Sequence, residues 1–538
     1  MPTKTWFKAV FCKIGRFARA CAKNAFVQAF FFGAVAVLAL PPYGFLPALF
    51  IGFGGLGFLL TRTDSLKRAF FIGFLFGFAH FAFGLSWVSN ALLVDEYFAW
   101  LAPFPPLGFG IWGGPFVALA CLCAVLTIRR GGFWRLLALS GYWGLFEQLR
   151  GVAYTGFPWN LTATVWSDMP VMIQTASFWG SYGLSVVTVF AATTTGLLFI
   201  KETPVKKRVF AAVLPAVAVL TALAGFGAWR LHTAFAPDDF VRGIRFRLVQ
   251  ANIPQGQKWD FKVAERTLDK HVTLSSKIAG LNDVTHIVWP ETATQFLLAQ
   301  EEYARSMAVT GLPDGTLLLA GSLRSEKDKN PDAYPPYKVF NSIVVLNNVG
   351  DWVATYDKAH LVPFGEYAPL KSIFPFMKKV TAGMFDFSAG DRVRTVDVPK
   401  TPPVGMLVCY EVIFPGEVVD RDRRPYWLLN VTNDGWYGIS AGPYQHFAAA
   451  RMRAVEEGLP VVRSANTGIS GVIDSFGRVT AFLDLGVEGF KDAALPRPLP
   501  DFTFFGKYGN KVPFVFATLL ILFSFFGAML NKRKKETP

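Results

Sequence analysis

Charged residues are scarce in this sequence. Asp, Glu, Lys and Arg make up 17% of its 538 residues, whereas hydrophobic residues make up 52%. Soluble proteins carry about 25% charged residues, so this composition excludes a purely water-soluble chain and favours a membrane protein. Internal repeats, low-complexity tracts, nucleotide-binding glycine motifs and clusters of metal-ligating residues are also lacking. The sequence therefore predicts no cofactor and no metal site.

Cysteines are few and unevenly placed. Of the five, Cys12 and Cys21 precede the first apolar run, Cys121 and Cys123 lie within another, and Cys409 stands alone in the more polar part of the chain. A lone thiol has no disulfide partner there. In an oxidising compartment such a thiol is either buried and inert or chemically active.

The apolar residues divide the chain. Positions 26–228 are rich in Phe, Leu, Ala, Gly and Trp, whereas 229–511 has an ordinary mixture of charged and apolar residues. The second block is long enough to bury a core of its own. We therefore expect a membrane domain over 1–228, a globular domain over 229–511, and a last span with a basic tail over 512–538.

About eight apolar runs are candidates to cross the bilayer, which takes roughly 20 helical residues. The first two runs are short, and the fifth contains Glu147. The runs cover residues 25–40, 44–60, 69–92, 107–127, 133–149, 178–200, 209–228 and 512–530.

The net charge of +15 would suit a nucleic-acid partner only if the basic residues formed one face with stacking aromatics. Instead they gather at the ends of alternate apolar runs, so no nucleic-acid partner is predicted. With a cytoplasmic N-terminus, every basic cluster lies inside, as the positive-inside rule requires, and 229–511 faces outward. No small-residue cleavage pattern follows Leu40, so we expect the first run to be a retained anchor. The clusters are Lys4 to Lys23, Arg62 to Arg68, Arg129 to Arg135, Lys201 to Arg208 and Lys532 to Lys535.

Two ionisable residues, Glu147 and Arg150, lie at the outer end of the fifth run, just before residues 156–160. Ionisable groups at membrane depth are costly and face a polar interior or cavity. They either fix helix packing or contact a substrate at the outer surface.

The globular part alternates short β-rich runs with helical patterns over 262–278 and 444–457, which predicts an α/β or layered α+β fold. Residues 347–350 carry turn signals between 339–346 and 352–356, so we expect a hairpin there. The other predicted strands cover 244–253, 286–289, 316–323, 404–412, 427–431 and 461–473.

Three short segments at the ends of such runs carry reactive groups. Glu291 follows Trp289, Lys358 and His360 follow Tyr356, and Cys409 precedes Glu411. A thiol nucleophile, a carboxylate base and a cation that stabilises an oxyanion can together transfer an acyl group.

The motifs around these residues resemble the nitrilase superfamily, in the version found in bacterial apolipoprotein N-acyltransferases. The likeness covers almost the whole chain and includes the membrane part. It rests on VWPET, YDKAHLVPFGEYAP, LVCYEVIFP, NDGWYG, LVQANIPQGQKW, QHFAAARMRAVEEGLPVVRSANTGISGVID and LRGVAYTGFPW. The resemblance implies an extracytoplasmic αββα sandwich on a multi-span helical membrane domain.

The resemblance also implies residue roles. Glu291 is the expected general base, Lys358 stabilises the oxyanion, and Cys409 is the nucleophile that becomes a thioester. Glu366 matches a second pocket carboxylate. The resemblance assigns no catalytic role to His360, which we interpret as structural.

Further supporting residues follow from the same motifs. Strand alternation would place Glu411, rather than Tyr410, on the same side as Cys409. The remaining pocket or entrance candidates are Asn341, Trp259 and Trp436, and residues 374–379 and 383–387 are candidate lid elements.

The implied reaction has two lipid-anchored substrates. Cys409 takes a fatty acyl group from a membrane phospholipid and donates it to the α-amino group of a diacylglyceryl cysteine on an apolipoprotein, at the periplasmic face of a bacterial inner membrane. One alternative is a membrane-anchored nitrilase-type amidase, which a single span would suffice to tether. A transporter or channel is another, but it would need paired or broken helices with polar linings.

Overall fold

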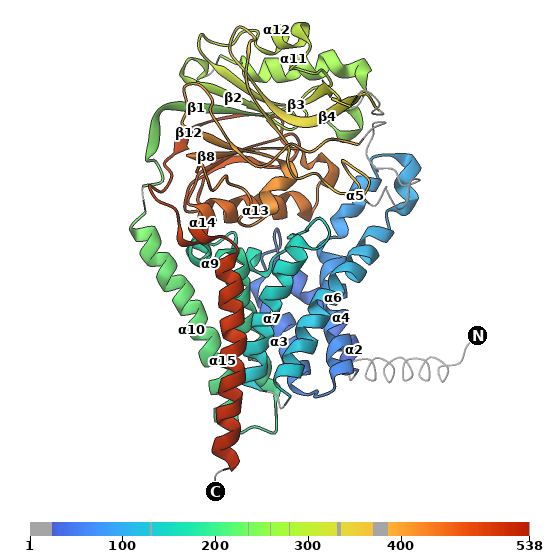
Figure 1. The fold of residues 1–538 in the computed structure, drawn as a ribbon, viewed down its shortest axis with the longest axis vertical. Helices are drawn as coiled ribbons and strands as arrows, with labels where there is room; N and C mark the ends of the chain where they lie inside the picture. The colour runs from blue at the N-terminus through green and yellow to red at the C-terminus, as the bar shows by residue number, and fades with distance from the viewer. Residues whose placement is uncertain are drawn as a thin grey trace, which may run out of the picture.

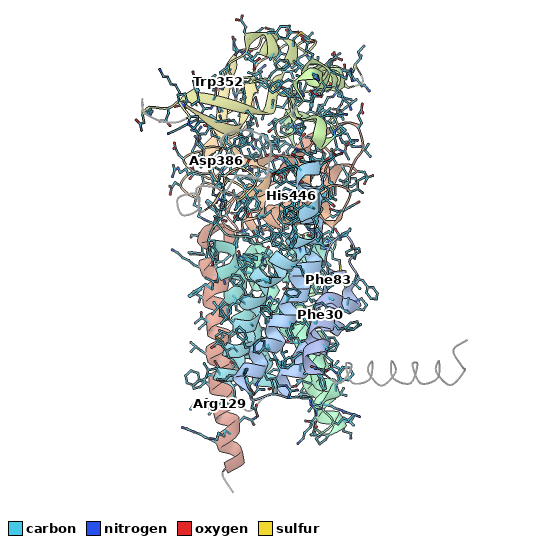
Figure 2. All side chains as sticks on the ribbon, turned by 90° about the vertical axis from the view of Figure 1, so that its right-hand side faces the viewer. Phe30, Phe83, Arg129, Trp352, Asp386 and His446 are labelled. Atoms are coloured by element: carbon cyan, nitrogen blue, oxygen red, sulfur yellow. The ribbon has the colours of Figure 1, made fainter. Side chains whose placement is uncertain are left out.

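The computed structural model describes residues 24–129, 132–234, 236–258, 260–278, 280–330, 335–369 and 386–536. A bundle of apolar helices forms one end of the molecule, and two stacked sheets form the other (Figure 1). Figure 2 shows Phe30 and Phe83 on the bundle, Trp352 on the sheets, and Arg129 at the end of the bundle away from the sheets.

Every predicted apolar run lies on a helix of the bundle. Five helices of the described chain are long and apolar enough to cross a membrane, namely α4, α6, α9 with its 3₁₀ extension, α10 and α15. The predicted count of about eight is therefore not confirmed, because α2 and α3 are shorter and α7 is not among the five. The bundle consists of α2 (Ala25–Ala36), α3 (Leu46–Thr61), α4 (Leu66–Gly84), α6 (Phe104–Thr127), α7 (Phe133–Val152), α9 (Ala176–Thr194), α10 (Val205–His232) and α15 (Lys511–Glu536).

The predicted run over 69–92 is not one helix. α4 ends at Gly84 and is followed by η2 (Ser86–Val88), α5 (Ser89–Leu92) and η3 (Glu96–Leu101). The Gly84 carbonyl accepts hydrogen bonds from Asn160 Nδ2 at 2.9 Å and from Gln445 Nε2 at 3.4 Å. Contacts from distant segments thus occupy the carbonyl group that a continuing helix would use.

Among its described residues, the globular part contains two six-stranded sheets, ordered β12-β1-β2-β3-β4-β5 and β11-β10-β9-β8-β7-β6. The strands are β1 (Phe240–Gln250), β2 (His286–Trp289), β3 (Leu317–Lys327), β4 (Tyr337–Leu346), β5 (Trp352–Asp357), β6 (Thr395–Val396), β7 (Val404–Val408), β8 (Trp427–Thr432), β9 (Val461–Ala465), β10 (Ser470–Ile473), β11 (Val479–Leu483) and β12 (Gly489–Pro496). The hairpin predicted at 347–350 is confirmed and joins β4 to β5.

Two strand predictions need correction. The run over 404–412 ends as a strand at Val408, because Cys409 takes a positive φ and opens the 3₁₀ helix η9 (Cys409–Ile413). The run over 461–473 is two antiparallel strands, β9 and β10, rather than one. Strand propensity alone marks neither the end of β7 nor the turn between β9 and β10.

Alternation along the strands builds the layers. Leu248 of β1 lies in one buried cluster with Met406 of β7, between the sheets. Its neighbour Val249 points the other way and packs in a cluster with Leu268 of α11 (Ala264–Ser275). α11 and α12 (Glu302–Ala308) cover the first sheet.

Helix α13 (Ala441–Glu457) covers the second sheet and lies between it and the membrane bundle (Figure 1). The Ser440 side chain caps its start, and Gly458, with φ 65°, ends it. The short helices α8 (Pro170–Ile173) and α14 (Phe504–Tyr508) complete the junction.

Candidate active site

The three reactive residues follow three different strands. Glu291 follows β2, Lys358 follows β5, and Cys409 follows β7. β2 and β5 belong to the first sheet and β7 to the second. The site therefore lies where strand ends of both sheets meet.

A buried polar cluster surrounds Lys358. Its Nζ lies 3.0 Å from the Glu366 carboxylate and 3.7 Å from that of Glu291. Asn341 Nδ2 donates to both carboxylates, at 2.7 Å to Glu291 and 2.9 Å to Glu366. All four side chains are buried. Burial alone would lower the pKa of Lys358, but Glu366 and Glu291 raise it above its usual value, so the ammonium stays protonated.

A second buried lysine was missed by the sequence reading. Lys258 is 4% exposed, and its Nζ donates to the backbone carbonyl of Glu291 at 2.7 Å. Burial lowers its pKa to about 8, although Glu291 and Cys409 oppose that shift. Its sequence signal was its place in LVQANIPQGQKW, directly before Trp259, which itself lies outside the described residues.

Cys409 occupies a strained turn. Its φ is 52°, a left-handed value that costs a non-glycine residue about 1 to 3 kcal/mol unless its surroundings hold it. The thiol is buried, and burial, followed by the charge of Glu291, raises its pKa to about 12, whereas Lys358 acts in the opposite direction. At neutral pH the sulfur is therefore a thiol, and it needs a base to become a nucleophile.

Strand alternation does not apply to Glu411, because Cys409 to Ile413 is a 3₁₀ helix rather than a strand. Glu411 Oε1 accepts hydrogen bonds from the N–H groups of Ala359 at 2.8 Å and His360 at 3.0 Å. Oε1 also accepts from the Tyr356 hydroxyl at 2.9 Å, and Oε2 accepts from Val408 N at 2.7 Å. This carboxylate ties the Lys358 loop to the turn that carries Cys409.

Tyr410 and His360 face the membrane bundle. The Tyr410 hydroxyl donates to Gly156 O at 2.8 Å, and its ring stacks on Phe157. His360 Nε2 lies 2.8 Å from Thr155 O. These contacts join the site to the 155–157 segment, in line with the structural interpretation of His360.

Glu147 and Arg150 hold the same outer segment. Glu147 Oε1 accepts from the N–H and the hydroxyl of Thr162, both at 2.9 Å. Arg150 NH1 donates to Phe157 O at 2.6 Å and to Trp159 O at 2.8 Å. This geometry favours the packing interpretation over direct substrate contact.

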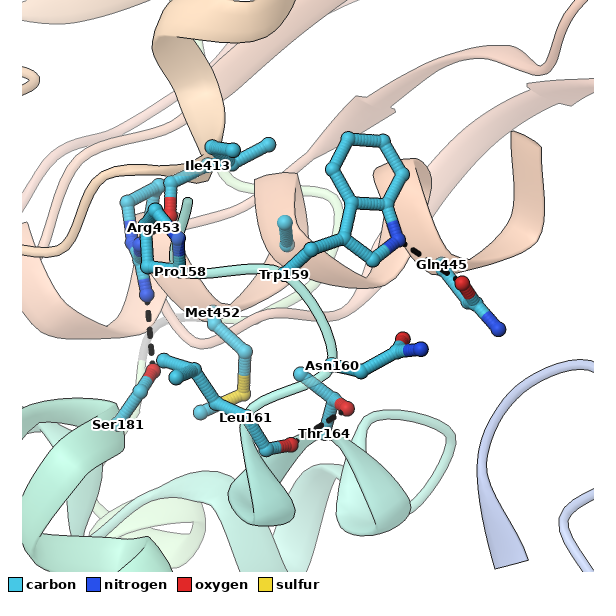
Figure 3. Close-up of a pocket in the computed structure, with 11 residues that line it drawn as sticks. Pro158, Trp159, Asn160, Leu161, Thr164, Ser181, Ile413, Gln445, Met452 and Arg453 are labelled. Atoms are coloured by element: carbon cyan, nitrogen blue, oxygen red, sulfur yellow. Dashed lines mark hydrogen bonds between the residues drawn. The ribbon is translucent and has the colours of Figure 1, made fainter. Parts of the chain in front are cut away.

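Two hollows lie near these elements. One, of about 260 Å³, is lined by Ala359, His360, Val393, Glu411, Phe414 and Glu417. The other, about 10 Å³ and thus the size of one water molecule, lies between α13 and residues 158–164 (Figure 3). Trp436 is half-buried in η10 (Asp434–Tyr437). Of the candidate lid elements, residues 374–379 and 383–385 lie outside the described residues.

A buried cysteine, glutamate and lysine at the strand ends of two stacked sheets define a thiol-dependent catalyst of the nitrilase type. In agreement, residues 245–499 match the carbon-nitrogen hydrolase family, and residues 32–194 match the apolipoprotein N-acyltransferase N-terminal domain.

Relatives that match almost the whole chain define its family more closely than the two domain matches. An apolipoprotein N-acyltransferase of Bradyrhizobium diazoefficiens is 40% identical over 508 residues, which cover 91% of this chain and 92% of that protein. One of Rhodopseudomonas palustris is 37% identical over 521 residues, covering 93% and 94%. The nitrilase-superfamily protein Nit3 of Saccharomyces cerevisiae is 19% identical, covers 47% of this chain and 90% of its own, and has a TM-score of 0.35. The chain belongs to the apolipoprotein N-acyltransferase family, and it is a membrane enzyme of the N-acyltransferase class.

Proposed function

We propose that this enzyme moves a fatty acyl group from a membrane phospholipid, through a Cys409 thioester, to the α-amino group of a diacylglyceryl cysteine at the start of an apolipoprotein. The observation that carries the proposal is the thiol of Cys409, which interacts electrostatically with both Glu291 and Lys358 inside a domain that stands on an apolar helix bundle.

In the first step Glu291 takes the thiol proton, and the Cys409 sulfur attacks an ester carbonyl of the phospholipid. The Lys358 ammonium stabilises the oxyanion of the tetrahedral intermediate. When that intermediate collapses, the carbon–oxygen ester bond breaks, and the lysophospholipid leaves with the proton that Glu291 returns. The acyl group remains on sulfur as a thioester.

In the second step the acceptor's α-amino group attacks the thioester carbonyl. Glu291 takes a proton from the amine, the carbon–sulfur bond breaks, and the sulfur recovers the proton as a thiol. An amide is formed. Water has to be kept out between the steps, because hydrolysis of the thioester would compete with transfer.

The other pocket residues position these groups. Asn341 and Glu366 set the approach of Lys358 to Glu291, because Asn341 bonds both carboxylates. Glu411 and Tyr410 hold the turn that carries the nucleophile. Trp259 and Trp436 are proposed to lie at the acyl entrance.

We further propose eight membrane spans, with α2, α3 and α7 added to the five longer helices, and domain limits of 1–228, 229–511 and 512–538. The catalytic domain then faces the periplasm of a bacterial inner membrane. The place of Arg129, at the far end of the bundle from the sheets (Figure 2), supports that orientation.

Mass spectrometry of the purified protein after incubation with phospholipid tests the proposal. We expect an acyl adduct on the Cys409 peptide that hydroxylamine removes and that is absent from Cys409→Ser and Glu291→Gln variants. A folded protein without any adduct would refute it. Hydrolysis of a small amide without lipid turnover would indicate the amidase, and solute flux that persists in Cys409→Ala would indicate a transporter.

A further inference from the structure

The imidazole of His446, on α13, holds the backbone of Cys409. His446 is fully buried, and its Nε2 donates to Cys409 O over 3.1 Å. Its Nδ1 lies 2.7 Å from Asp434 Oδ1, and Arg463 NH2 donates to the other Asp434 oxygen at 2.9 Å. Because these three side chains form one buried network, the ring has a single orientation.

The contact between His446 and Cys409 O lies at the residue whose backbone is strained. A left-handed φ at a cysteine persists only when surrounding groups over-determine it. The Cys409 carbonyl also accepts a hydrogen bond from Asn430 Nδ2, at the longer distance of 3.5 Å. His446 is thus the closer of these two side-chain donors to the peptide that follows the nucleophile.

The preceding residue, Gln445, binds the membrane domain. Its Oε1 accepts from Trp87 Nε1 at 2.9 Å and from Trp159 Nε1 at 2.8 Å. Its Nε2 donates to Pro41 O at 3.3 Å and to Gly84 O at 3.4 Å. One glutamine amide therefore joins three separate outer segments of the membrane domain to α13.

The two contacts are physically continuous. Figure 3 shows the bond between Trp159 and Gln445 beside α13, with a second link from Arg453 to Ser181. The Trp159 ring also packs against the His446 ring, with centroids 5.3 Å apart. A shift of the outer segments of the membrane domain would therefore displace both Gln445 and His446.

We propose that Gln445 and His446 are a pair of positioning residues, which couple the position of the membrane domain against α13 to the conformation of the turn that carries Cys409. The pair sets how the thiol is presented to Glu291 rather than how lipid is bound. This inference rests on the proposed role of Cys409 as nucleophile.

Matched variants of the full-length protein in detergent test the proposal. His446→Gln keeps an amide donor near the position of Nε2, whereas His446→Asn is too short to reach Cys409 O. Gln445→Leu removes the membrane contacts. Two rates are measured at Cys409 by peptide mass spectrometry: acylation by phosphatidylethanolamine and alkylation by iodoacetamide.

A matched control is Gln174→Leu. Gln174 is also fully buried and also crosses to the globular part, donating to Phe476 O at 2.8 Å, but its contacts do not include the Cys409 turn. We expect its two rates to stay within twofold of those of the unmodified protein.

We expect His446→Asn and Gln445→Leu to lower both rates at least tenfold with the lipid KM within twofold, and His446→Gln to keep at least a third of each rate. The double variant should be no slower than the slower single variant, since both changes break one linkage. Equal rates for the Asn and Gln variants, or a Gln445→Leu that behaves like Gln174→Leu, would overturn the proposal. Absence of lipid acylation in an unmodified protein that is still alkylated would refute the proposed function instead, and the alkylation series would remain decisive for this pair.

Discussion

Replacing Glu411 with Gln removes one carboxylate oxygen from a site that needs two. Oε1 has three donors, the N–H groups of Ala359 and His360 and the Tyr356 hydroxyl, while Oε2 has Val408 N. The amide oxygen of Gln can take the place of Oε1. Its NH₂ group then faces the N–H of Val408, and that buried donor is left without an acceptor.

The magnitude follows from these contacts. A hydrogen bond to a charged group contributes about 1.5 to 3 kcal/mol, and an orphaned buried N–H costs about 1 kcal/mol more. Burial raises the pKa of Glu411, so removing the charge relieves part of that penalty. We expect Glu411→Gln to lower the free energy of unfolding by about 2 kcal/mol. Since the side chain no longer bonds Val408 N, the turn that carries Cys409 is no longer tied to the Lys358 loop, and Cys409 acylation should fall at least tenfold.

The assay is unfolding by sodium dodecyl sulfate in mixed micelles, followed by tryptophan fluorescence, together with the acylation rate at saturating phospholipid. Asp422→Asn is a control in a nearby segment, because its side chain is 87% exposed. A Glu411→Gln protein as stable as Asp422→Asn, with an acylation rate within twofold of the unmodified enzyme, would refute this account of the turn.

Three further substitutions test other parts of the site. Lys258→Met should slow acylation at least fivefold. Because the native pKa of Lys258, about 8, lies below the ordinary 10.5, the unfolded chain binds more protons at this lysine between these values. The stability of the unmodified protein relative to Lys258→Met should therefore rise with pH across that window, as thermal unfolding of both proteins at several pH values would show. Gly321→Ala should displace the base, because a Cβ there would meet the Pro290 carbonyl and lie 2.5 Å from Glu291 Cα; unchanged acylation would contradict this. Arg150→Met removes both bonds from NH1 to the 157–159 segment, so limited proteolysis there should be faster than in the unmodified protein.

Much of the architecture was readable from local patterns. Apolar runs located the bundle helices because a helix in lipid has to be apolar along its length, whatever it packs against. Short β-rich runs located β2, β4 and β8 for a similar reason, since side chains on both faces of these strands are mostly buried. Where a distant group intervened, the patterns were wrong, as at Gly84 and at Cys409.

The kinds of reactive group could also be predicted from the sequence, because thiol chemistry needs a base and a cation and the motifs around Glu291, Lys358 and Cys409 carry both. The arrangement of these groups in space could not be predicted. Lys258 received no role from the sequence, and only the fold placed it against the carbonyl of Glu291, 33 residues away.

The sequence by itself determined which segments are apolar enough to enter a membrane and which residues are candidates for acyl transfer, because hydropathy and side-chain chemistry are local properties. Only the tertiary structure decided the left-handed turn at Cys409, the anchoring role of Glu411 and the link from Trp87 and Trp159 through Gln445 to the nucleophile. Those features depend on contacts between residues up to several hundred positions apart, and such contacts exist only after the sheets and the helix bundle have packed together.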